Sequence, residues 1–129
     1  MMHKVTGIGG FFFRARDGAA LARWYADMLG VDPVPETYDM QPWRQEAGPT
    51  IVAGMPADSE LFGDSGAGWA INFRVADLDA MVQQLSDAGV IVEVDPERYP
   101  NGRFAGLHDP EGNPIQLWQL EGAESSGPA

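Results

Sequence analysis

The sequence contains two copies of one unit, one in each half of the chain. Phe13-Arg14-Ala15-Arg16-Asp17 in the first half matches Phe73-Arg74-Val75-Ala76-Asp77 in the second. Each copy later ends alike, in Leu29-Gly30-Val31 and in Ala88-Gly89-Val90. An internal repeat constrains a fold strongly, because each copy must build the same elements in the same order.

Each copy begins with a pattern typical of a strand. In the second copy Ile71, Phe73 and Val75 alternate with polar or small residues, so they share one face of the predicted strand. Phe11 and Phe13 take the equivalent places in the first copy.

An aspartate follows each predicted strand, where its side chain can accept hydrogen bonds from the free backbone donors of a new helix. Apolar residues at spacings of three and four then predict helices over 19–29 and 78–88. Gly30 and Gly89 stand just beyond these helices, where a left-handed backbone is common.

Shorter strands follow each helix. The pattern predicts strands at 43–46 and 50–53 in the first copy, and at 91–94, 104–108 and 115–120 in the second. The run Asp109-Pro110-Glu111-Gly112-Asn113 has the composition of a hairpin turn. The whole chain, 1–129, therefore reads as a single α+β domain. Its predicted parts are modules 5–55 and 68–120, linker 56–67 and flexible tail 122–129.

Length and composition exclude several classes of protein. At 129 residues the chain suits one domain, and its lack of cysteine excludes disulfide scaffolds and thiolate chemistry. We find no apolar run long enough to span a bilayer and no signal-peptide pattern, so we expect a cytoplasmic protein with no membrane partner. A formal net charge of -11 argues against nucleic acid as a partner. The same charge favours a neutral or cationic small molecule, although it can also serve solubility alone.

The repeated strand–helix–strands unit, with Gly7-Ile8-Gly9-Gly10 opening the first copy and the 109–113 turn before the last strand, resembles the vicinal oxygen chelate superfamily. That superfamily contains glyoxalase I, the bleomycin resistance proteins and the extradiol dioxygenases. The resemblance covers about residues 5–120. It implies two βαβββ modules that form a curved mixed sheet around a cleft, and it implies a homodimer.

In metal-dependent members of this superfamily, His, Glu or Gln side chains from the first and last strands hold a divalent cation. The resemblance places these four positions on Gly10, Ala70, Gln116 and a residue near Ile51. Glycine and alanine offer no ligand atom, and a catalytic site usually needs three protein ligands. We therefore predict no metal and no other cofactor, and the chain's standing as an enzyme stays open.

Gln116 is then expected to face the cleft with an amide that hydrogen-bonds a ligand. The alternative is that it pairs with a neighbouring strand residue such as Asn72. Trp118 lies on the same predicted face and either contacts the ligand or packs within the sheet.

Further cleft candidates come from both copies. Arg14 and Arg74 take equivalent places and could clamp a carboxylate, or else form ion pairs with nearby acidic residues. Phe12 and Trp43 are aromatic candidates for the cleft lining, or for the core. His108 could act as a base only with a partner and a pocket position, and a structural role is the alternative.

These residues favour a protein that binds a small organic molecule in its cleft without a catalytic metal. One alternative is a metal-dependent lyase or dioxygenase of the glyoxalase type with an unusual ligand set. Another is a partner-binding module whose cleft has lost its use. One fold can carry many chemistries, so the resemblance alone does not choose between them.

Overall fold

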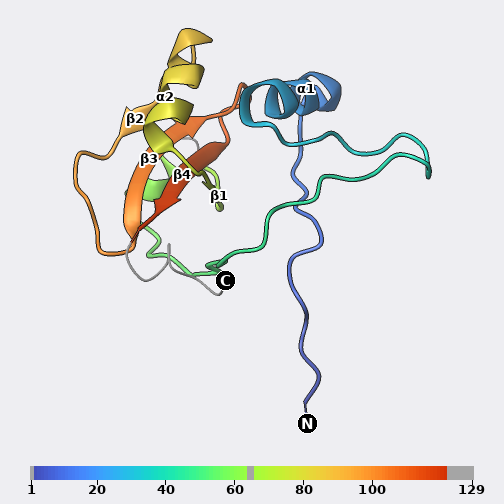
Figure 1. Ribbon diagram of the computed structural model, residues 1–129, viewed down its shortest axis with the longest axis horizontal. Helices are drawn as coiled ribbons and strands as arrows, with labels where there is room; N and C mark the ends of the chain where they lie inside the picture. Colours follow the sequence, from blue (N-terminus) through green and yellow to red (C-terminus); the bar gives the residue numbers. More distant parts are fainter. Residues whose placement is uncertain (1, 64–65, 122–129) are drawn as a thin grey trace.

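A four-stranded mixed sheet in the second half of the chain forms the centre of the structure (Figure 1). The computed structural model describes residues 2–63 and 66–121. Its elements in chain order are α1 (Gly18–Leu29), the 3₁₀-helix η1 (Glu60–Phe62), β1 (Ile71–Arg74), α2 (Leu78–Asp87), β2 (Glu93–Val94), β3 (Gly102–His108) and β4 (Pro114–Leu120). The predicted tail 122–129 lies outside the described residues. The division of the chain into modules 5–55 and 68–120 stays a prediction.

The strand order is β1-β4-β3-β2, with β1 parallel to β4 and the other pairs antiparallel. The second copy therefore forms the strand, helix and three strands that its sequence predicts, and the predicted α+β class is confirmed. Strand β2 is shorter than the predicted 91–94, whereas β3 and β4 begin earlier than predicted.

Both helices lie where the sequence places them, because their end signals are local. The Asp17 carboxylate accepts a hydrogen bond from Ala20 N, and the Asp77 carboxylate accepts one from Ala80 N. In each case the donor lies three residues further along the chain, and the distance is 3.0 Å. Gly30 closes α1 with a left-handed backbone at φ 74°.

Helix α2 covers one face of the sheet (Figure 1). Leu78 and Leu85 of α2 are fully buried, and they pack in the same cluster as the fully buried Leu117 of β4. Leu21 and Tyr25 of α1 join this cluster. The core therefore lies between the sheet and the two α-helices, and neither α1 nor α2 covers the other sheet face.

The predicted strands of the first copy are wrong for this structure. The residues around Phe11 and Phe13, and the segments 43–46 and 50–53, are assigned to no strand. Figure 1 shows the amino-terminal segment that leads to α1 as a coil outside the sheet. A strand needs a partner for its backbone hydrogen bonds, and the described chain supplies none here.

Within residues 2–63 and 66–121, none of the helices combines the length and the apolar character that a membrane span needs. The predicted cytoplasmic location stays a prediction from the sequence.

Candidate functional site

The sheet face opposite α2 gathers the second-copy candidates. Residues with odd numbers on β3 and β4, such as Ala105 and Leu117, belong to the core. Alternation therefore turns the even-numbered residues to the opposite face. We call this surface the open face; its predicted site residues are Asn72, Arg74, His108, Gln116 and Trp118.

Asn72 and Gln116 form a hydrogen-bonded pair on the open face. They are direct neighbours across β1 and β4, and Asn72 Nδ2 donates to Gln116 Oε1 at 2.7 Å. Of the two expectations for Gln116, the structure shows the pairing with Asn72. The pair leaves Asn72 Oδ1 as an acceptor and Gln116 Nε2 as a donor, neither bonded within the described residues.

Trp118 packs within the sheet. Only 3% of its surface is exposed, and its indole Nε1 donates to Asn101 O at 2.9 Å. Phe104 of β3 stacks on it at an interplanar angle of 9°. The ring is therefore covered and its N–H is already bonded, so Trp118 has a packing role and offers no free hydrogen-bond donor.

Arg74 connects the open face to the first copy. Its Nη2 donates to Glu46 O at 2.9 Å, so this hydrogen bond goes to a backbone carbonyl and not to a carboxylate. Gly48 lies so close to this guanidinium that a Cβ there would collide with it. The segment around 46–48 thus lies beside the open face.

His108 occupies the far end of β3 and is exposed. Its Nε2 lies next to Gly63, just after η1, because a Cβ on Gly63 would approach it to 2.9 Å. The imidazole therefore borders the connection between the two copies.

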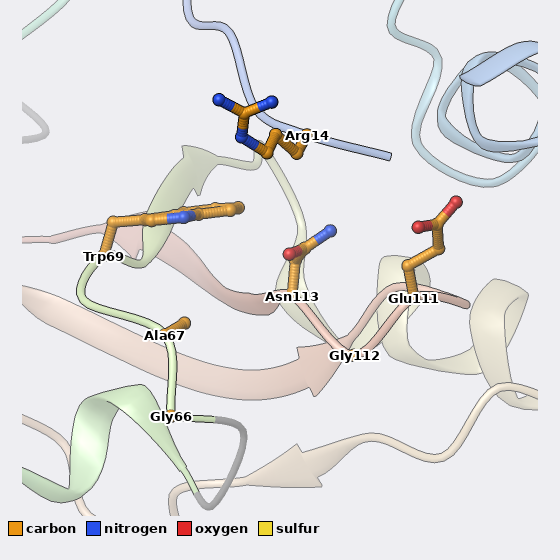
Figure 2. A pocket seen from close by; sticks show the side chains of 7 residues that line it. All are labelled: Arg14, Gly66, Ala67, Trp69, Glu111, Gly112 and Asn113. Carbon is orange, nitrogen blue, oxygen red and sulfur yellow. The ribbon is translucent and has the colours of Figure 1, made fainter. Parts of the chain in front are cut away.

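Among the described residues, no ring contact joins the first-copy candidates Phe12 and Trp43 to the aromatic side chains of the open face. Phe12 is 93% exposed and Trp43 39% exposed. Arg14 instead lines a separate cavity of about 370 Å³ together with Trp69, Glu111 and Asn113 (Figure 2).

The turn between β3 and β4 carries contacts that the sequence did not predict. Asp109 is only 4% exposed, and its carboxylate accepts from Glu111 N, Asn113 N and Asn113 Nδ2 at 2.9, 3.0 and 2.7 Å. Tyr25 of α1 completes this set by donating its hydroxyl to Asp109 Oδ2 at 2.8 Å. Burial, and then this bond to Asp109, raises the pKa of the Tyr25 hydroxyl.

Glu111 makes a second link from the turn, to the two residues just before α1. Its two carboxylate oxygens accept from Arg16 N at 2.7 Å and from Asp17 N at 3.0 Å. These backbone donors lower the pKa of the Glu111 carboxyl. The composition of the turn was the available signal, but composition alone did not show that its acidic side chains bind α1.

Comparison with known proteins identifies the family. A glyoxalase-like domain matches the chain over residues 10–118. The chain belongs to the glyoxalase-like domain family. This confirms the resemblance to the vicinal oxygen chelate superfamily.

A curated relative is the anthracycline biosynthesis protein DnrV of Streptomyces peucetius, which is 35% identical over 127 residues. The match covers 91% of this chain and 44% of that protein, so the chain spans less than half of that relative's length.

Two solved structures share the fold. The antibiotic binding protein TnmS3 from Streptomyces sp. CB03234 matches with a TM-score of 0.59 at 23% identity, covering 93% of this chain and all of that one (100%). The lactoylglutathione lyase from Agrobacterium tumefaciens matches with a TM-score of 0.58 at 20% identity, covering 90% of this chain and 95% of that one. At these identities the likeness shows the fold alone.

The residues at the superfamily's metal positions do not fit a divalent cation. Gly10 and Ala70 have no donor atom, and Ile51 is aliphatic. The carbonyl oxygen of Gln116 already accepts from Asn72. Such cations require several charged or imidazole ligands, and the side chains at these positions supply none.

Proposed function

We propose that this chain is a small-molecule-binding member of the glyoxalase-like family that works without a resident metal. The observation that carries this proposal is the Asn72–Gln116 pair on the open face. The pair presents one acceptor and one donor on the same sheet face as the partly exposed ring of Phe104. Apolar walls with a few oriented polar groups are typical of ligand sites.

The chemistry of the open face favours an uncharged or cationic organic molecule. Neither amide carries charge, and a formal net charge of -11 repels anions. The similarity to an anthracycline biosynthesis protein supports a natural product with aromatic rings. The fold it shares with an antibiotic binding protein is compatible with the same reading.

The protein is proposed to bind this ligand as a homodimer. Apolar side chains of the first copy are uncovered in the single chain, including Phe12 at 93% and Val52 at 85% exposure. Each such side chain gains roughly 1.5–3 kcal/mol on full burial. A second copy that covers these segments would also satisfy backbone groups that lack strand partners. It would bring Phe12 and Trp43 toward a cleft that one chain leaves incomplete.

Light scattering coupled to gel filtration tests the dimer. We expect about twice the chain mass of 14.0 kDa for the wild type. Phe12→Asp should shift the protein toward the monomer, because a charge would be buried in the contact. A monomeric wild type at micromolar concentration would contradict the dimer.

Fluorescence titration with an anthracycline and calorimetric titration with bleomycin test the ligand site. Binding of either molecule should weaken about fivefold in Gln116→Leu, since this removes one hydrogen-bonding amide worth about 1 kcal/mol. Gln83→Leu, at an exposed glutamine of α2, is the matched control and should bind as the wild type does. Equal affinities of the two variants would show that the ligand does not bind at the open face. No binding of either molecule to the wild type would contradict the proposed ligand class.

A further inference from the structure

The cavity beside Arg14 is separate from the open face. It lies between Arg14 in the first copy and the turn that joins β3 to β4, with Trp69 along its border (Figure 2). Trp69 packs against Phe11 and Phe13, with ring centroids 5.0 and 5.5 Å apart. Its aromatic neighbours therefore belong to the α1 side of the molecule, whereas Asn72 and Gln116 lie on the open face.

Trp69 gives this cavity a fixed aromatic wall. The two phenylalanine contacts restrict how the half-buried indole can turn. Planar rings stack favourably on such a surface, and the volume of about 370 Å³ falls within the usual range for ligand pockets.

The polar groups around the wall differ in kind. Arg14 makes no hydrogen bond or ion pair within residues 2–63 and 66–121, so its guanidinium donors are available. Asn113 Nδ2 is bonded to Asp109 Oδ2 at 2.7 Å, which fixes the amide and leaves Oδ1 as an acceptor. Glu111 accepts from two backbone N–H groups just before α1, those of Arg16 and Asp17. The cavity thus offers one cationic donor and one neutral acceptor that is already oriented.

We propose that this cavity is a second binding site, which takes a planar aromatic molecule of about two rings bearing an acceptor oxygen and a hydroxyl group. The rings stack on Trp69, the guanidinium of Arg14 donates to the acceptor oxygen, and the hydroxyl donates to Asn113 Oδ1. The acceptor is either a carboxylate or a neutral carbonyl, because a guanidinium donates to both.

Calorimetric titration of the full chain with 6-hydroxy-2-naphthoate tests the site. Arg14→Gln should weaken binding about tenfold, because a charge-assisted hydrogen bond is lost. Arg23→Gln, an exposed arginine of α1 outside the cavity, is the matched control and should bind as the wild type does. The naphthoate without its hydroxyl, 2-naphthoate, should bind about fivefold more weakly.

Titration with 6-acetyl-2-naphthol, which carries a ketone in place of the carboxylate, shows which of the two acceptor groups Arg14 prefers. Tighter binding of the naphthoate would identify an ionised acid as the ligand group, and tighter binding of the ketone would identify a neutral carbonyl. Trp69→Leu should lose both ligands, and thermal melting of that variant checks that it is folded.

Three results would overturn the second site. One is the absence of binding by both compounds to the wild type. Another is equal affinity of Arg14→Gln and Arg23→Gln. The third is loss of binding in Gln116→Leu, which would assign these ligands to the open face. The site does not depend on the proposed function, because an anthracycline can bind the open face whether or not the naphthoate binds here.

Discussion

The hydrogen bond between Tyr25 and Asp109 should be a large contributor to the stability of this chain. Tyr25→Phe removes the hydroxyl that donates to Asp109 Oδ2 at 2.8 Å and keeps the ring. A buried hydrogen bond to a charged group contributes roughly 1.5–3 kcal/mol. Asp109 keeps three other donors in the variant, so the loss should lie near the lower half of that range, at about 2 kcal/mol.

Urea denaturation followed by circular dichroism measures this loss. In thermal melting, the same change of about 2 kcal/mol should lower the melting temperature of a chain of 129 residues by about 8 °C. Tyr38→Phe, at a fully exposed tyrosine, is the matched control and should change little. A loss below about 0.5 kcal/mol, the size of an ordinary surface substitution, would refute the reasoning.

The same pair predicts an alkaline dependence. The pKa of Tyr25 is raised in the folded chain above its ordinary value of 10.0. Above that value the unfolded chain loses the hydroxyl proton while the folded chain retains it, so this contribution to the free energy of unfolding falls as the pH rises. The decline should be smaller in Tyr25→Phe than in Tyr38→Phe.

Three further substitutions test other contacts. The pKa of Glu111 is lowered from 4.5 in the folded chain, so its contribution to the free energy of unfolding is present above pH 4.5 and is lost as the pH falls through the folded value. Glu111→Gln should therefore flatten the acid part of the plot of stability against pH, whereas the control Glu36→Gln should not. Gly102→Ala should cost roughly 1–3 kcal/mol, because φ is 142° and a Cβ would collide with the backbone of β4, whereas Gly106→Ala has room. Leu117→Ala should cost roughly 2–5 kcal/mol by leaving a cavity in the core, and a smaller loss in urea denaturation would contradict the packing.

The parts of the fold that sequence predicts well are those set by neighbouring residues. The helices follow from Asp17 and Asp77 at their beginnings and from glycines just beyond their ends. The second-copy strands follow from alternation and from the turn before β4. The first-copy strands fail because a strand also requires a distant partner, which no local pattern supplies.

The candidate site divides in the same way. Alternation correctly placed Asn72 and Gln116 on one face, and the parallel register then brought them together. The cavity beside Arg14 depends on how the first copy meets the turn after β3, which the repeat does not specify. Tyr25 and Asp109 are 84 residues apart, and neither has a counterpart in the other copy that would predict their contact.

Elemental analysis of the protein purified without chelators tests most directly whether Gln116 belongs to a hydrogen-bonding face or to a metal centre. The same sample is then followed by thermal melting after addition of Ni, Zn, Mn or Fe(II). The Asn72–Gln116 pair predicts no more than trace metal and no shift in melting temperature. One metal ion per chain that is lost in Gln116→Leu would contradict the proposed metal-free site. It would show that Gln116 is a metal ligand, as in the metal-dependent enzymes of the superfamily.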